Sequence, residues 1–111
     1  MPDDAGKLEQ IWFDSCAETG LEKPTDFGDP DRYVYLGDHH YAGLSVVSGA
    51  YRRGLTEATG DDSVELLRQL TLESKYPHLL GDERWSTTAL TAVAKTIGYN
   101  RDRQASEKER M

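Results

Sequence analysis

Apolar residues in the first part of the chain recur with a period near 3.6. The positions that form this stripe are Leu8, Ile11, Trp12 and Cys16. The spacing predicts an amphipathic helix over about residues 4–18. Asp3 or Asp4 is placed to cap its start, and Gly20 is placed to end it. Residues 22–32 carry two prolines and a glycine, which is typical of a loop.

The middle of the chain changes to a period of two. Aromatic and aliphatic residues alternate over 33–36, and this predicts a β-strand. Gly37-Asp38 and Ser48-Gly49 have the composition of tight turns, so further strands are expected over about 41–47 and 51–58. The aliphatic side chains expected to face the core are Val34, Leu36, Leu44 and Val46.

Helical periodicity returns in the last third. Asp62 and Glu65 have capping-box spacing and predict a helix that ends by about Ser74. Ser86 is expected to cap a further helix, which Gly98 ends. The apolar positions on these two helices are Val64, Leu66, Leu67, Leu70, Leu90, Val93, Ala94 and Ile97.

The predicted order is one helix, a three-stranded antiparallel meander and two further helices. We therefore expect a single α+β domain over residues 1–100, with the helices packed on one face of the sheet. Residues 101–111 have no apolar stripe. They are expected to form a charged C-terminal tail or a solvated helical extension.

Acidic residues outnumber basic ones, and the formal net charge is −7. Residues 1–40 hold 10 acidic and 3 basic side chains, so the excess lies in the first part of the chain. Such a charge disfavours nucleic acid and anionic membranes as partners and favours a basic protein. The start of the chain lacks the pattern of a secretory signal, and the single cysteine, Cys16, cannot form an internal disulfide. A cytoplasmic protein is expected.

Two tyrosines in the first predicted strand alternate with aliphatic residues and should therefore face outward. Aspartates flank them in the sequence. Exposed tyrosines among carboxylates are typical of a surface that binds a basic protein. An alternative is that tyrosine simply suits strands and that the acids keep the domain soluble. The candidate contact residues are Asp29, Asp31, Tyr33, Tyr35 and Asp38.

Motifs of catalysis and metal binding are incomplete in this sequence. Asp38-His39-His40 resembles a metal-binding run, but adjacent strand residues point to opposite faces, and a hairpin-turn role is expected. Asp26-Phe27-Gly28 matches the kinase magnesium tripeptide without its companion motifs. We expect no catalytic residues, no metal and no cofactor.

Three segments together resemble the small immunity proteins of bacterial polymorphic toxin systems. They are His40–Gly49, Tyr51–Thr59 and Asp61–Leu67, which read as a short hairpin, a threonine-acid junction and a Glu-Leu-Leu helix start. The resemblance implies a cytosolic, non-enzymatic inhibitor that binds one cognate toxin with a basic surface. Two alternatives remain open. One is a small phage or host regulatory or adaptor protein, and the other is a small enzyme or ligand-binding protein.

Overall fold

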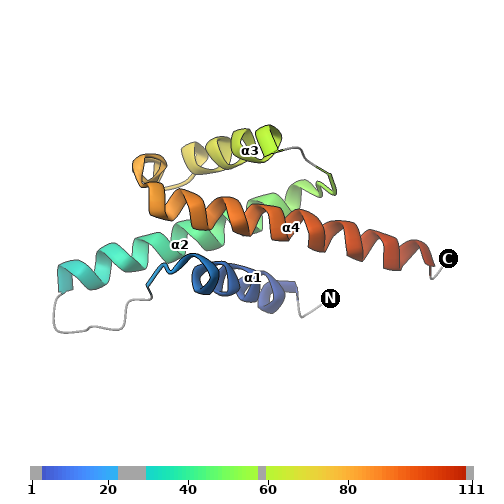
Figure 1. The fold of residues 1–111 in the computed structure, drawn as a ribbon, viewed down its shortest axis with the longest axis horizontal. Helices are drawn as coiled ribbons and strands as arrows, with labels where there is room; N and C mark the ends of the chain where they lie inside the picture. Colours follow the sequence, from blue (N-terminus) through green and yellow to red (C-terminus); the bar gives the residue numbers. More distant parts are fainter. Residues whose placement is uncertain (1–3, 23–29, 58–59, 110–111) are drawn as a thin grey trace.

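A computed structural model describes residues 4–22, 30–57 and 60–109, with side chains for all of these except residues 31–33 and 108–109. This part of the chain forms four α-helices and one short 3-10 helix. Helix α4 packs against all the other elements, so it forms the centre of the bundle (Figure 1). The elements are α1 (Asp4–Thr19), α2 (Pro30–Arg53), α3 (Gly60–Glu73), η1 (Pro77–Gly81) and α4 (Glu83–Glu109).

The predicted α+β fold is wrong, because no strand is present in the described residues. The segments 33–36 and 41–47 and the start of 51–58 all lie in the 24-residue helix α2. The turn predicted at Gly37-Asp38 is also helical. Residues 58 and 59, at the end of the third predicted strand, lie outside the described residues.

Burial along α2 follows the helical period rather than alternation. Val34, expected in the core, is 60% exposed, whereas Val46 is buried as expected. The buried positions of α2 recur three or four residues apart, which places them on one face. They are His39, His40, Ala42, Val46, Val47 and Ala50.

Two tryptophans hold the middle of α2 from different sides. Trp12 of α1 and Trp85 of α4 are both fully buried, which confirms the expected burial of Trp12. The indole N–H of Trp12 donates to Nδ1 of His40 at 3.0 Å. The indole N–H of Trp85 donates to the backbone carbonyl of His39 at 2.9 Å. Large apolar rings thereby cover α2 while each indole N–H stays hydrogen-bonded.

Glycine allows these close contacts on α2. A Cβ atom at Gly43 would lie 2.1 Å from the ring of Trp12, and one at Gly49 would lie 2.6 Å from Leu70. At Gly43 the rigid indole ring leaves no room for a side chain, whereas at Gly49 the terminal methyl of Leu70 would have to move. Both glycines lower the intrinsic helix propensity of α2. They are the positions where α1 and α3 pack onto this helix.

One carboxylate joins three helices at the end of the bundle where α1 begins. Tyr51 of α2 and Tyr99 of α4 both donate to Asp4, at 2.5 and 2.8 Å. These two hydrogen bonds hold the pKa of Asp4 below its usual value. Asp4, which the sequence suggested as a helix cap, therefore joins α1, α2 and α4.

Helix α4 continues past residue 100 without a break, so the predicted tail takes the form of a helical extension as far as Glu109. Its outer turns are mostly exposed. The guanidinium of Arg103 lies 5.0 Å from the centre of the Tyr51 ring. The first turn of the extension therefore still contacts the bundle.

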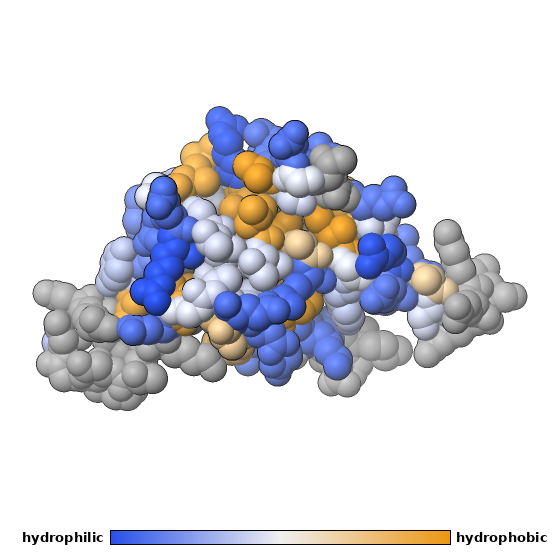
Figure 2. Space-filling view, viewed as in Figure 1, coloured by the Kyte–Doolittle hydropathy of each residue, from blue (hydrophilic) through white to orange (hydrophobic). Residues whose placement is uncertain are grey.

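An apolar groove of about 460 Å³ opens between α3 and α4. Figure 2 shows hydrophobic surface between these helices, with hydrophilic residues around it. Val64, expected to be buried, is 52% exposed at this groove. No helix in the described residues is long and apolar enough to cross a membrane.

Candidate functional site

The structure rearranges the predicted contact patch. Asp29 lies outside the described residues, and Asp31 and Tyr33 lie in the first turns of α2, with side chains that are not described. Tyr33 and Tyr35 are about 200° apart around a helix, so they cannot share one face. Asp31, Tyr35 and Asp38 instead recur at i, i+4 and i+7, which places these three positions on one face of α2.

Tyr35 is the predicted contact residue whose environment is best defined. Its side chain is 52% exposed, yet its hydroxyl donates to Oδ2 of Asp82 at 3.1 Å. The ring of His39 meets its ring edge-on, with centroids 4.4 Å apart. Burial is the main cause of the raised pKa of Tyr35. The hydrogen bond from the Tyr35 hydroxyl to Asp82 raises this pKa further. An exposed ring is thus held in one orientation.

Asp82 organises this end of the bundle. Its Oδ1 accepts the backbone N–H of Trp85 at 2.9 Å, which makes Asp82 the N-cap of α4. Its Oδ2 accepts Nε2–H of His39 at 2.7 Å. Partial burial raises the pKa of Asp82, but the hydrogen bonds from Trp85, His39 and Tyr35 outweigh burial and hold this pKa below its usual value.

The cap predicted at Ser86 is wrong, because α4 begins earlier, at Glu83. The hydroxyl oxygen of Ser86 is buried with no hydrogen-bond partner within the described part of the chain. Aspartate and serine are equally good N-caps, and Asp82 stands directly before the acidic first turn of α4. The sequence is therefore equally compatible with an N-cap at Asp82. Its bonds to Tyr35 and His39 join residues far apart in the sequence and leave no local signal.

The two adjacent histidines do not form the expected hairpin turn, because both are buried in α2. Nδ1–H of His39 donates to the Tyr35 carbonyl at 2.9 Å, while its Nε2–H donates to Asp82. Both partners can only accept, so both bonds form only when each ring nitrogen carries a proton.

His40 has the opposite hydrogen-bonding requirement. Its Nδ1 accepts from the indole of Trp12, and its Nε2–H donates to the Glu22 carbonyl at 3.0 Å. Since an indole N–H can only donate, Nδ1 must be unprotonated in this arrangement. Both buried histidines are therefore held by hydrogen bonds within the bundle. No group of three metal-ligating side chains converges in the residues that the structure describes.

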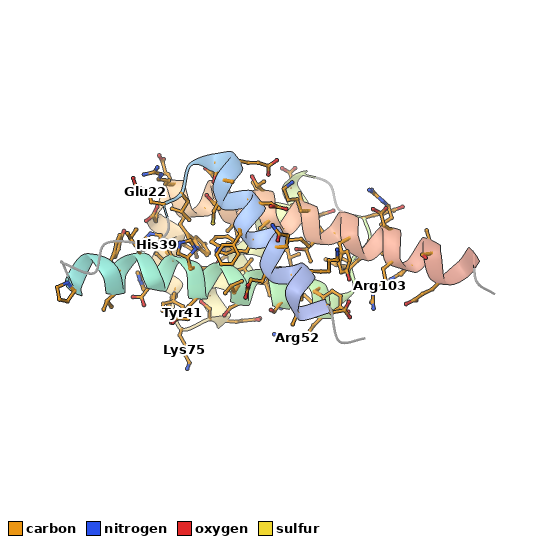
Figure 3. All side chains as sticks on the ribbon, turned by 90° about the horizontal axis from the view of Figure 1, so that it is seen from below. Glu22, His39, Tyr41, Arg52, Lys75 and Arg103 are labelled. Atoms are coloured by element: carbon orange, nitrogen blue, oxygen red, sulfur yellow. The ribbon has the colours of Figure 1, made fainter. Side chains whose placement is uncertain are left out.

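Three helices come together at the end of the bundle that holds Asp82. Helix α1 ends here, and α2 and α4 begin here (Figure 1). Figure 3 places Glu22 and His39 together at the same end. Arg84, a cation in this region, donates to the carbonyl of Gly20. We refer to this surface as the acidic end and define it by Glu22, Tyr35, Asp38, Asp82 and Glu83.

No protein-family model, no characterised protein and no solved structure shows significant similarity to this chain. The resemblance to toxin immunity proteins therefore rests on the sequence segments quoted above, and the hairpin expected for the first two of them is wrong, because residues 40–53 are helical. The functional interpretation depends on the physical chemistry of the acidic end.

Proposed function

We propose that the protein is a non-enzymatic binding module that contacts a basic protein partner through the acidic end. On the basis of the family resemblance, we propose a bacterial toxin as this partner, which the protein would inhibit in the cytoplasm. The observation that carries the proposal is the state of Tyr35, which is half exposed and yet fixed by Asp82 and His39.

A fixed tyrosine suits protein recognition for an energetic reason. Binding loses less conformational entropy when an exposed ring already has its bound orientation. Tyrosine is also among the residues that contribute most to binding at protein interfaces. Tyr35 would therefore act as the anchor of the contact.

The charge of the surrounding surface favours a basic partner. Glu22 and Glu83 are exposed, and Asp38 is half-buried on the face of α2 that carries Tyr35. Carboxylates around an anchor attract a basic surface over a distance of about 10 Å at moderate salt. They speed the encounter of the two proteins more than they tighten the final complex.

The proposal is tested by binding measurements with the product of the gene adjacent to the gene of this protein. The parent protein should bind that product, and Tyr35→Ala should raise the Kd by about tenfold or more. Leu72→Ala is the matched control, because Leu72 is 48% exposed on α3. It should leave the Kd within about twofold.

Tyr35→Ala also removes the hydrogen bond to Asp82, so its folding must be checked by circular dichroism. Asp38→Arg reverses a charge beside Tyr35 and should also weaken binding. The proposal is wrong if the adjacent product is not bound by the parent protein. It is also wrong if folded Tyr35→Ala and Asp38→Arg both bind as the parent does.

A further inference from the structure

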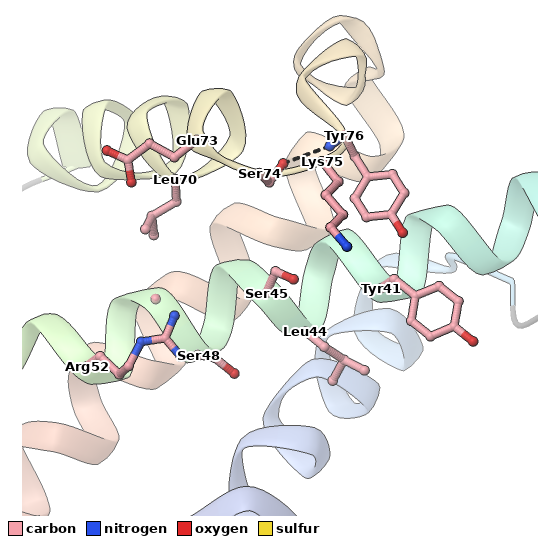
Figure 4. A pocket seen from close by; sticks show the side chains of 11 residues that line it. Tyr41, Leu44, Ser45, Ser48, Arg52, Leu70, Glu73, Ser74, Lys75 and Tyr76 are labelled. Atoms are coloured by element: carbon pink, nitrogen blue, oxygen red, sulfur yellow. Dashed lines mark hydrogen bonds between the residues drawn. The ribbon is translucent and has the colours of Figure 1, made fainter.

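A second site lies away from the acidic end, in a cleft between α2 and the end of α3. The cleft has a volume of about 650 Å³, which is within the range of small-molecule sites. Figure 4 shows α2 along one side, and the end of α3 with the turn at residues 74–76 along the other.

The cleft contains positive charge although the whole protein is acidic. Arg52 of α2 and Lys75 of the turn both line it. Neither makes an ion pair within the described residues. Glu73 also lines the cleft, but its carboxylate pairs with Arg53 at 3.1 Å. Two cations are therefore left without a carboxylate partner in the described part of the protein.

Hydroxyl groups lie between these cations. Ser45 and Ser48 are on the face of α2 that carries Arg52, at positions i, i+3 and i+7. In Figure 4 the side chain of Lys75 extends from the turn toward α2, on the side of Ser45. Hydroxyl, guanidinium and ammonium groups are the side-chain donors that bind phosphoryl oxygens. Two positive charges also match the charge of a phosphate monoester.

Two aromatic rings lie at the end of the cleft that holds Lys75. Tyr41 is 64% exposed, and Tyr76 is half-buried on the turn opposite it. Figure 4 shows both rings beside Lys75. Exposed aromatic faces stack on flat rings such as nucleobases. The cleft thus combines donors for a phosphate with a surface for a planar ring.

We propose that this cleft binds a small phosphate monoester joined to a planar ring, of the mononucleotide class. Arg52, Lys75 and the two serine hydroxyls contact the phosphate, and Tyr41 and Tyr76 contact the ring. This site shares no residue with the acidic end and needs no protein partner. Its test is therefore independent of the proposed function.

The test uses the full-length, ¹⁵N-labelled protein and AMP as the probe, with inorganic phosphate and adenosine as separate probes at constant ionic strength. AMP should shift the amide resonances of Ser45, Ser48 and Lys75 in a saturable manner. Phosphate alone and adenosine alone should each bind about tenfold more weakly than AMP. Equal affinity for phosphate and AMP would overturn the ring contact.

Single substitutions identify the cations involved. Arg52→Gln and Lys75→Gln should each weaken AMP binding about tenfold, because each removes a charge-assisted hydrogen bond. Arg68→Gln is the matched control, since Arg68 is an exposed cation of α3 that pairs with Glu65 and does not line the cleft. It should change the affinity less than about twofold. An absence of saturable shifts in the cleft, or equal losses for Arg52→Gln and Arg68→Gln, would refute the site.

Discussion

Nε2–H of His39 donates to Oδ2 of Asp82 at 2.7 Å, across 43 residues of sequence. This bond joins the buried face of α2 to the residue that caps α4. The other carboxylate oxygen of Asp82 accepts the Trp85 N–H, so one side chain serves both the helix start and the helix–helix contact. The same oxygen that holds His39 also holds the hydroxyl of Tyr35. The rigidity of the proposed anchor thus depends on Asp82.

Removal of this carboxylate should destabilise the protein. Asp82→Ala loses an N-cap, at a cost of about 1 kcal/mol, and leaves a buried donor of His39 unpaired, at about 1–3 kcal/mol. We expect the free energy of unfolding in urea to fall by about 2–4 kcal/mol. Asp102→Ala is the control, because its side chain is 79% exposed, and it should cost under ~0.5 kcal/mol. Equal losses for the two variants would show that Asp82 has no special role.

Stability should decline in acid. The pKa of Asp82 and the pKa of Asp4 are both below 3.8 in the folded protein, so the unfolded chain takes up protons first as the pH falls. Their contributions are complete only above about pH 5, and they are lost as the pH falls through the unfolded pKa and then the lower folded pKa of these carboxyls. Urea unfolding between pH 6 and pH 2.5 measures this loss.

Asp82→Asn provides the control for the acid effect. It retains a capping oxygen but cannot titrate, so its free energy of unfolding should fall less steeply with acid than that of the parent. If both proteins show the same slope, Asp82 does not contribute to the acid sensitivity.

Two glycines in α2 should respond in opposite directions to the same substitution. Gly43→Ala places a Cβ atom 2.1 Å from Trp12 and should cost at least about 1–3 kcal/mol through overpacking. At Gly37 the nearest atom, on Tyr41, is 3.8 Å away. Gly37→Ala should therefore stabilise α2 by about 0.5–1 kcal/mol. Thermal unfolding measures both changes, and a stabilising Gly43→Ala would contradict the packing of Trp12 on α2.

The extension of α4 should be largely dispensable beyond Arg103. A chain that ends after residue 103 should keep its free energy of unfolding within ~0.5 kcal/mol. A chain that ends after residue 101 also loses the contact of Arg103 with Tyr51, which should cost about 0.5–2 kcal/mol. Loss of the folded state in the longer of these two chains would mean that residues after 103 pack onto the bundle.

The sequence predicts helices where large apolar residues mark one face. Leu8, Trp12 and Cys16 did so for α1, and Leu67 and Leu70 did so for α3. Helix α2 gave no such signal, because its buried face consists mostly of alanine, glycine and histidine and its only large aliphatic residues are two adjacent valines. Its β-branched and aromatic residues favour strands locally, and its glycines weaken a helix. Tertiary packing on Trp12, Trp85 and Leu70 outweighs both effects.

The candidate site could be predicted only in part. An exposed Tyr35 was expected from strand alternation and is found on a helix. The pairing of Tyr33 with Tyr35 on one face was wrong because it assumed a period of two. Asp82 and His39 were not associated with Tyr35, because their contacts form only when α4 packs against α2. Long-range hydrogen bonds of this kind leave no periodic pattern in a sequence.

The most direct test of the acidic end is a measurement of association and dissociation rates with the adjacent gene product at two ionic strengths. Tyr35→Ala should raise the dissociation rate and leave association nearly unchanged. Replacement of Glu22 and Glu83 by glutamine and of Asp38 by asparagine should mainly slow association and reduce its dependence on salt. If both variants show the rates of the parent at both ionic strengths, the acidic end is not the contact surface.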